Sequence, residues 1–390
     1  AVDMASTLVV ASTINTVGIT GPKTNFVGSM LISNDAGTGT LNAASNNTGF
    51  GNEVFDDLTS GDSNTAVGSA ALAKLTTAGE NTAVGASALG ANTSGAANTA
   101  LGINALFANT TAANNTAVGR SSLEGNTTGT SNTAVGKDAL QGNTTADNNT
   151  AVGYAALEAN TTGTENTSVG ADAMQTSVTG NYNVAVGGNA LFAANGADSN
   201  TGIGYNALAA TTTGEFNTAV GSAALATNTT ADNNTAVGRN ALLVNTTGHT
   251  NVAVGALALD ANTTGNYNIA LGVNALTTNT TAADNIAIGT AALALNTTGA
   301  SNVAMGSNAL TANTTGASNV AVGTSALGAH TTGEYNVAVG ATAGDALTTG
   351  SLNTAVGYNT LGVATTAANN TAVGGQALAI NTSGANNTSV

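Results

Sequence analysis

The chain contains no cysteine and only one proline among its 390 residues. Without cysteine, neither disulfide bonds nor thiolate metal sites can support the fold. Small secreted eukaryotic domains usually depend on disulfides. If the protein works outside the cell, its composition therefore fits a bacterial or viral source better.

Charged residues are scarce as well, at 6% of the chain against roughly 25% in ordinary soluble domains. Lys and Arg together number five and the net charge is −15, which argues against a nucleic-acid partner, because phosphates need a basic stripe to neutralise them. No apolar run is long enough to cross a bilayer, so we expect no membrane span. Asn and Thr supply the polarity, and 42% apolar residues favour a packed core over disorder.

What the chain does have is a 17-residue repeat without insertion or deletion, with an Asn at every seventeenth position from Asn47 to Asn387. Such a register predicts that each unit is one coil stacked on its neighbour, because a slipped residue would displace every later side chain. We number the coil positions 1 to 17 from this Asn, as in NTAVGASALGANTSGAA from Asn81. The sequence predicts an all-β parallel β-solenoid of the β-roll type, with about 20 coils.

Positions 2 to 5 predict a strand followed by a turn. β-Branched residues at 2 and 4 are typical of extended chain, and the small residue at 3 would point to the opposite side. Position 5 is Gly in all twenty full units, which indicates positive φ or no room for a Cβ; examples are Gly68, Gly85, Gly102 and Gly119. The large apolar residues at 4 and the Leu at 9 are the predicted core, for example Val67, Leu72, Val84, Leu89, Leu106 and Val118.

The Asn at position 1 predicts a ladder of side-chain amides, because an amide can both donate to and accept from its copy in the next coil. The members we expect include Asn64, Asn81, Asn98, Asn115, Asn132 and Asn149. A Thr pair at positions 13 and 14 could form a second ladder through its hydroxyls.

Positions 6 to 12 allow two interpretations. Small polar residues at 7, Ala-Leu at 8 and 9 and Asn at 12 fit a short helical turn in each coil, and they equally fit a strand or an irregular arm with a corner. The variable positions 6, 7, 10, 16 and 17 hold most charges and aromatics, including Arg120 and Tyr154, and are expected to face outward.

The two ends differ from the repeat. Residues 1–46 lack it and predict a capping or attachment region, with strands at 6–13 and 30–34, a loop at 34–40 and the only proline, Pro22. At the other end the sequence stops four residues into a coil, at Asn387, Thr388, Ser389 and Val390. Either the native chain continues, or this edge pairs with the next subunit in a head-to-tail assembly.

Position 2 is Val or Ile in six consecutive coils, from Val252 to Val337. On a solvated face these residues would form an exposed apolar stripe. We therefore expect this face to be buried inside the coil or against another chain, which makes an oligomer plausible.

No catalytic, cofactor-binding or metal-ligating pattern is present. His249 and His330 lie nearly five coils apart, too far to share a metal, and are expected to be solvated outward residues. Asn-Thr-Thr at Asn109 and Asn143 matches a glycosylation acceptor, but a repeated turn is the simpler explanation. The adjacent Thr residues at positions 13 and 14 are a poor match to the flat Thr array of an ice-binding face. An enzyme that cleaves polysaccharide would need a pair of acidic residues at one level of the solenoid, and the sequence shows no such recurring pair.

The segments NTAVG and NVAVG resemble the V-A-I-G signature of trimeric autotransporter adhesin heads, whose repeats form left-handed parallel β-rolls. The longer unit NTAVGxxALxxNTTG also looks like repeats of phage tail-fibre-like proteins. Over residues 47–390 the resemblance implies an extracellular and often trimeric rod used for attachment. The 17-residue coils are longer than the usual adhesin-head coil, and no coiled-coil stalk is seen.

The resulting prediction is a non-enzymatic structural or adhesive fibre protein, extracellular and located at a cell surface or on a virion. It would self-associate as a head-to-tail filament or a trimer and contact a cell-surface or glycan target. One alternative is a tail-fibre or adhesin rod whose C-terminal tip is missing, and another is an ice-binding solenoid.

Overall fold

A computed structural model describes residues 18–20, 30–33 and 43–390 of the chain. The chain divides into two compact units, Ala1–Thr162 and Gly163–Val390. In each unit a short strand returns every 17 residues and pairs in parallel with the strand of the next coil. The described residues contain no helix, and the prediction of an all-β parallel β-solenoid is confirmed.

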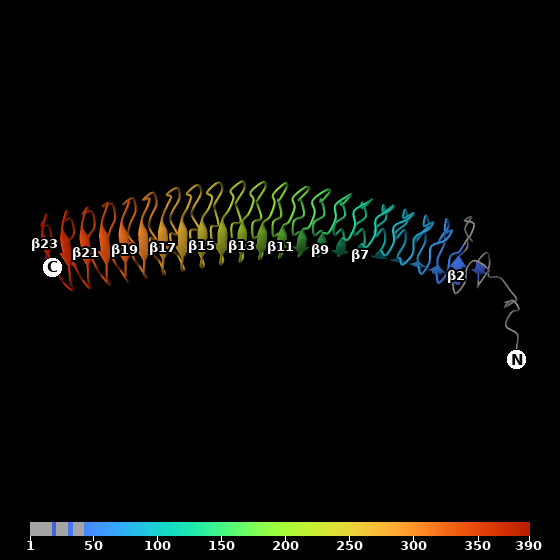
Figure 1. Ribbon diagram of the computed structural model, residues 1–390, viewed down its shortest axis with the longest axis horizontal. Helices are drawn as coiled ribbons and strands as arrows, with labels where there is room; N and C mark the ends of the chain where they lie inside the picture. Colours follow the sequence, from blue (N-terminus) through green and yellow to red (C-terminus); the bar gives the residue numbers. More distant parts are fainter. Residues whose placement is uncertain (1–17, 21–29, 34–42) are drawn as a thin grey trace, which may run out of the picture. The chain divides into compact units, whose positions relative to one another are not determined.

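In unit 1 the strands follow one another in the order of the sequence (Figure 1). β1 pairs antiparallel with β2, and β2 pairs parallel with β3. The expected strand at 30–34 corresponds to β2, whereas the expected strand at 6–13, the loop at 34–40 and Pro22 lie outside the described residues. The strands of unit 1 are β1 (Gly18–Thr20), β2 (Met30–Ser33), β3 (Thr48–Phe50), β4 (Thr65–Val67), β5 (Thr82–Val84), β6 (Thr99–Leu101), β7 (Thr116–Val118), β8 (Thr133–Val135) and β9 (Thr150–Val152).

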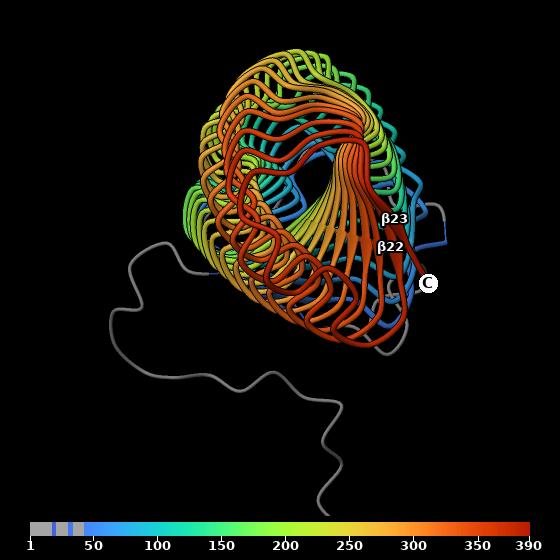
Figure 2. The same cartoon turned by 90° about the vertical axis from the view of Figure 1, so that its left-hand side faces the viewer.

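Unit 2 repeats the same arrangement, and equal coil positions pair across neighbouring strands, as in Ala219 with Ala236. Figure 2 shows strands such as β22 along one side of the coil, with the remaining positions forming the other sides. The strands of unit 2 are β10 (Thr167–Val169), β11 (Val184–Val186), β12 (Thr201–Ile203), β13 (Thr218–Val220), β14 (Thr235–Val237), β15 (Val252–Val254), β16 (Ile269–Leu271), β17 (Ile286–Ile288), β18 (Val303–Met305), β19 (Val320–Val322), β20 (Val337–Val339), β21 (Thr354–Val356), β22 (Thr371–Val373) and β23 (Thr388–Ser389).

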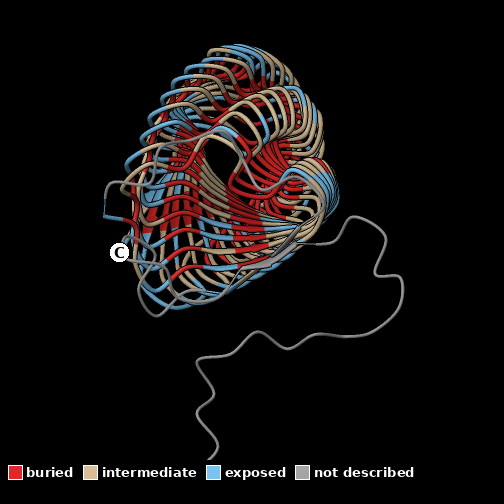
Figure 3. Cartoon of the chain, turned by 90° about the vertical axis from the view of Figure 1, so that its right-hand side faces the viewer, coloured by how far each residue is buried: buried red, intermediate tan, exposed pale blue. Residues whose placement is uncertain are grey.

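The core lies inside each coil and is built from positions 3, 8 and 9. Ala83, Ala88 and Leu89 are completely buried, and the same positions are buried in almost every coil (Figure 3). Each buried Leu contributes roughly 1.5–3 kcal/mol. Leu72, Leu89 and Leu106 lie where the sequence analysis placed them.

The prediction that position 4 belongs to the core is wrong. Val67, Val84 and Val118 are only half-buried, because their side chains point away from the coil interior while the Ala at position 3 points into it. Strand side chains alternate between the two faces. Position 3 carries only Ala, Gly or Ser along the repeat, so small side chains face the Leu of position 9 and the larger residues occupy the outer face.

Positions 6 to 12 form an irregular arm of successive turns, which decides between the two interpretations of this segment. Positions 7 and 9 have positive φ, as in Ser87 (57°) and Leu89 (51°). Turn hydrogen bonds join position 8 to 5 and position 10 to 7, for example Ala88 N to Gly85 O (3.3 Å) and Gly90 N to Ser87 O (3.2 Å). Type II turns likewise have positive φ at their third residue. The N–H of Leu89 donates to Ala105 O in the next coil (3.0 Å), so the arms also bond between coils.

The glycine at position 5 is required both by its φ and by space. Gly68 and Gly85 have φ of 130° and 140°, where side chains are strongly disfavoured. A Cβ on Gly68 would lie 2.5 Å from the carbonyl oxygen of Gly85. Neighbouring coils are therefore in backbone contact at this corner.

The predicted Asn ladder at position 1 is confirmed. The amide of Asn64 donates to Asn47 Oδ1 (3.0 Å), and the amide of Asn81 donates to Asn64 Oδ1 (3.1 Å). The same oxygen of Asn64 also accepts the backbone N–H of Asn81 (3.0 Å). The ladder members named from the sequence are all buried, with at most 1% exposure: Asn64, Asn81, Asn98, Asn115, Asn132 and Asn149.

A second amide ladder, which sequence analysis missed, occupies position 12. The amide of Asn109 donates to Asn92 Oδ1 (3.0 Å), and the amide of Asn126 donates to Asn109 Oδ1 (3.1 Å). The recurring Asn at position 12 is the sequence signal for it, but Asn is equally typical of a turn. The hydroxyl of Thr at position 13 donates to the backbone carbonyl of Thr in the next coil, as from Thr127 to Thr144 (3.0 Å), so this contact uses the backbone instead of a second hydroxyl.

Candidate functional site

The outer face of the sheet, formed by positions 2 and 4, is the most distinctive surface of each unit. Its side chains are half-buried or exposed in every described coil, as the burial patterns of β5 and β18 show. Neither position carries a charge in any coil. Position 4 is always large and apolar, with exposed members such as Leu101 (47%) and Met305 (40%). Monomeric soluble proteins rarely leave a continuous apolar surface of this kind uncovered.

The two units differ on this outer face at position 2. In unit 1 the residue is Thr in every repeat strand, from Thr48 to Thr150. In unit 2 it is apolar in six successive strands, which the sequence analysis expected to be covered; these residues are Val252, Ile269, Ile286, Val303, Val320 and Val337. Because they point outward, they do not belong to the coil interior. Unit 2 therefore carries an apolar stripe two residues wide.

Positions 6 and 17 adjoin the two ends of the strand and carry much of the outward variation. Exposed aromatic residues at these positions include Tyr154, Tyr205 and Tyr267. Lys137 Nζ lies 5.1 Å from the centroid of the Tyr154 ring, a cation–π contact between neighbouring coils. The flanks of the outer face are thus more polar and more varied than its centre.

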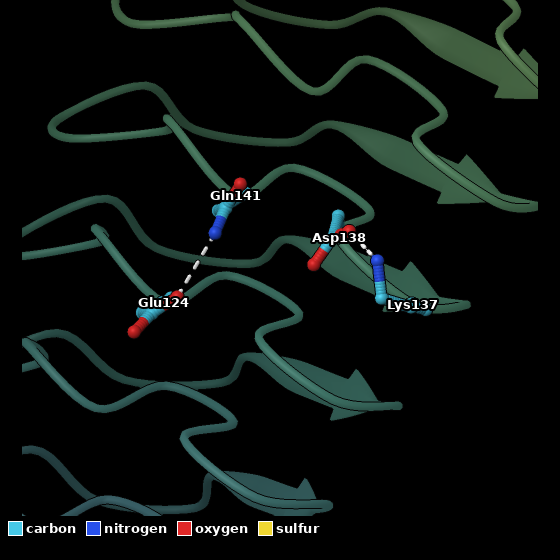
Figure 4. A network of polar contacts seen from close by, with 4 residues as sticks. All are labelled: Glu124, Lys137, Asp138 and Gln141. Atoms are coloured by element: carbon cyan, nitrogen blue, oxygen red, sulfur yellow. Dashed lines mark hydrogen bonds and ion pairs between the residues drawn. The ribbon is translucent and has the colours of Figure 1, made fainter.

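A small polar network lies on the arms of unit 1 (Figure 4). Glu124 accepts hydrogen bonds from the amides of Asn104 (3.1 Å) and Gln141 (3.0 Å), which join three successive coils. Lys137 forms an ion pair with Asp138, and this hydrogen bond raises the pKa of Lys137. All these groups are satisfied by neighbours, so the network holds the arms together and offers no reactive group.

The second Asn ladder contains one titratable substitution, His330 at position 12. The prediction that His330 is a solvated outward residue is wrong, because its side chain is completely buried. Nε2 lies 2.8 Å from the carbonyl of Gly333, while Nδ1 and the Asn313 Oδ1 have no hydrogen-bond partner among the described residues. Burial lowers the pKa of His330. His249, in contrast, is half-buried with its ring edge-on to Tyr267.

Asp345, on the arm of a coil in unit 2, also has a shifted pKa. Desolvation raises the pKa of Asp345, and its Oδ1 has no partner among the described residues. Among the residues that the structure describes, no three His, Cys, Asp or Glu side chains gather as a metal site would require. His330 and Asp345 lie on neighbouring coils, joined beside them by the bond from Ala329 N to Asp345 O (2.9 Å).

The candidate glycosylation acceptors and the C-terminal residues named from the sequence both belong to the repeating structure of the coils. Asn109 and Asn143, the candidate glycosylation acceptors, are buried members of the second ladder. Thr388 and Ser389 form β23, which pairs with β22, and Asn387 bonds to Asn370 as the next step of the first ladder. The role of Asn387 to Val390 as an assembly edge stays a prediction.

No protein-family model matches the chain, and no curated protein matches it. Within the described residues, no helix is long and apolar enough to span a membrane.

Proposed function

We propose that this protein is a non-enzymatic, extracellular structural or adhesive fibre protein whose copies associate laterally through the outer face of unit 2. The observation that carries the proposal is the uncharged apolar surface formed by positions 2 and 4. A second copy is a suitable partner, because its strands repeat at the same spacing of roughly 4.8 Å and can match coil by coil. The resemblance to trimeric adhesin heads and tail-fibre-like repeats supports a cell-surface or virion location.

The size of the stripe suggests how far the contact extends. Six strands at about 4.8 Å cover about 29 Å, and a three-residue strand is about 10 Å long, which gives roughly 300 Å² for each copy. A stable interface buries about 800 Å² on each partner. We therefore expect the contact to include further strands of unit 2, whose position 4 is apolar in every coil.

The test is to place a charge at the centre of the stripe with Ile286→Glu and to measure the mass of the full chain by sedimentation velocity. The wild type is expected to sediment as a dimer or trimer and the variant as a monomer, because an unpaired buried carboxylate would be strongly unfavourable. Thr133→Glu is the matched control, since it puts the same charge at position 2 of unit 1. A wild-type monomer at about 100 μM, a concentration at which weak micromolar association would be visible, would exclude the proposal.

Ice binding is a second candidate. It is favoured by the Thr column at position 2 of unit 1, which is a different set from the adjacent Thr residues at positions 13 and 14. The position 2 column from Thr65 to Thr150 points outward once in every coil, on the face opposite the buried Ala of position 3. Thermal hysteresis of the wild type, lost in Thr116→Glu, would support it. A freezing point equal to the melting point would exclude it.

A further inference from the structure

A shallow groove of about 280 Å³ lies on the arms of two successive coils of unit 2. It is lined by Asn189, Phe192, Asn206 and Ala209. The two Asn residues are at position 7 and the other two residues at position 10 of their coils. Phe192 is the aromatic residue of the lining, and Ala209 is so small that a larger side chain there would occupy the groove.

The backbone holds the two Asn residues in place and leaves their amides available. The N–H of Asn189 donates to Ala171 O and the N–H of Asn206 to Gly188 O, both at 3.1 Å. Both residues have positive φ, at 55° and 58°. Within the described residues neither side-chain amide has a hydrogen-bond partner in the protein, although each can donate twice and accept twice.

Unit 1 contains a similar pair of residues that lacks this opening. Phe107 at position 10 follows Asn104 at position 7, but the next coil carries Glu124 at position 10. The Asn104 amide donates to that carboxylate (3.1 Å) and is no longer available. The groove of unit 2 is thus set apart by two unpaired amides and by Ala209.

We propose that this groove binds one neutral pyranose ring of a glycan, with a C–H face of the ring against Phe192 and its hydroxyls bonded to the amides of Asn189 and Asn206. A pyranose has an apolar face and a rim of hydroxyls that both donate and accept. An aromatic face beside two amides provides the matching surfaces. No charged residue lines the groove, which favours a neutral sugar over an acidic one.

The groove volume of about 280 Å³ matches a single ring. Pockets for drug-sized molecules range from about 300 to 1,000 Å³, so this open groove suits a single monosaccharide unit. We expect a Kd in the millimolar range, about −4 kcal/mol, with tighter binding only when several copies of the protein act together. The inference rests on the proposed adhesive role and names its ligand class.

The experiment is saturation-transfer NMR on the full chain with the methyl glycosides of glucose, galactose, mannose and N-acetylglucosamine, and with sialic acid. At least one neutral glycoside is expected to bind. Phe192→Ala should weaken it at least tenfold and Asn206→Ala about three- to tenfold. Ala209→Phe should block the groove while leaving both amides in place, and position 10 already carries Phe in two other coils.

Phe107→Ala is the matched control and should leave binding unchanged. Absence of binding by every neutral glycoside at about 50 mM, well above the expected Kd, would overturn the proposal. Binding of sialic acid alone, or full binding by Ala209→Phe, would overturn it as well. Sedimentation of the same samples keeps the two proposals apart, because a chain that self-associates without binding sugar would retain its structural role.

Discussion

The two amide corners of the coil differ in how strictly they keep Asn. At position 1 every coil has Asn, whereas position 12 also carries Leu75, Ser177, Ala194, Thr211 and His330. The difference lies in what the side chain bonds to. At position 1 the Asn oxygen accepts the backbone N–H of the next coil, as Asn268 Oδ1 does from Asn285 N (3.1 Å). At position 12 the backbone N–H bonds within its own coil, as Asn262 N does to Leu259 O (3.2 Å).

The Asn column is therefore invariant along this chain where its side-chain oxygen accepts the backbone N–H of the next coil. Loss of Asn at position 1 leaves a buried N–H without a partner, which no other side chain replaces. Loss of Asn at position 12 interrupts the side-chain ladder and removes a donor from the position 15 carbonyl of the same coil, as from Asn262 to Gly265 O (3.0 Å). It leaves the backbone N–H of the next coil paired, so an apolar residue can fill the same space against the core. The comparison can be tested by substitutions at both corners.

The largest effect is expected for Asn268→Ala. It removes the acceptor of the Asn285 N–H and three further bonds, two donated by the Asn268 amide and one donated to Asn268 by the Asn285 amide. We expect a loss of about 4 kcal/mol, since each unsatisfied buried group costs about 1–3 kcal/mol. Asn262→Ala, the matched change at position 12, should cost about 1–2 kcal/mol. Urea denaturation and hydrogen exchange of the Asn285 amide measure the difference, and equal losses at the two corners would contradict this account.

The second effect concerns the coil that begins at Asn336, where position 9 is Gly and a Leu stands at position 12 instead. Gly344 stands where other coils have Leu at position 9, and Leu347 at position 12 is completely buried. A Cβ on Gly344 would lie 3.1 Å from both Leu347 Cδ1 and Leu327 Cδ2, so these two leucines close around the position that lacks a side chain. Leu347→Asn should therefore cost about 3 kcal/mol through the cavity.

The double variant Gly344→Leu/Leu347→Asn should recover most of that loss, because it restores the arrangement of the other coils. Gly344 has φ of 60°, close to the values that Leu adopts at position 9 elsewhere. Thermal denaturation of the two single variants and the double variant gives the coupling energy. Additive losses would show that the two positions do not share one space.

The smallest effect is expected for His330→Asn, which restores the amide ladder below Asn313. The variant should gain about 1 kcal/mol at neutral pH, because a buried acceptor regains its donor. Burial lowers the pKa of folded His330 below its unfolded value of 6.5. The unfolded chain therefore takes up a proton at His330 before the folded protein does. The free energy of unfolding falls as the pH drops from 6.5 toward the folded pKa, and it is unaffected by this group above 6.5.

The measurement is the free energy of unfolding between about pH 5 and 8, the range over which histidine titrates. The acid-side loss should shrink in His330→Asn and persist in His249→Asn, which removes the half-buried histidine of the same unit. An unchanged pH slope in His330→Asn would show that another group is responsible.

Much of the coil could be predicted from residue columns because a repeat shows each position many times. The Gly at position 5, the Leu at position 9 and the Asn at position 1 each have a narrow physical explanation, so their roles followed from residue type. The second ladder was less accessible, since Asn at position 12 also fits a turn. The groove at Phe192 could not be predicted from the sequence. It depends on the small size of Ala209 and on two amides that have no partner, and neither feature is visible in a residue column.

The sequence by itself determined the period, the strand at positions 2 to 4 and the first amide ladder, because local spacing and hydrogen-bonding capacity limit the alternatives. Only the tertiary structure decided which face of that strand points inward. Neither face carries a charge in the sequence, and the interior beside the Leu of position 9 takes only Ala, Gly or Ser. It also decided the conformation of positions 6 to 12, where Leu adopts positive φ because bonds to neighbouring coils compensate a backbone that propensity alone disfavours.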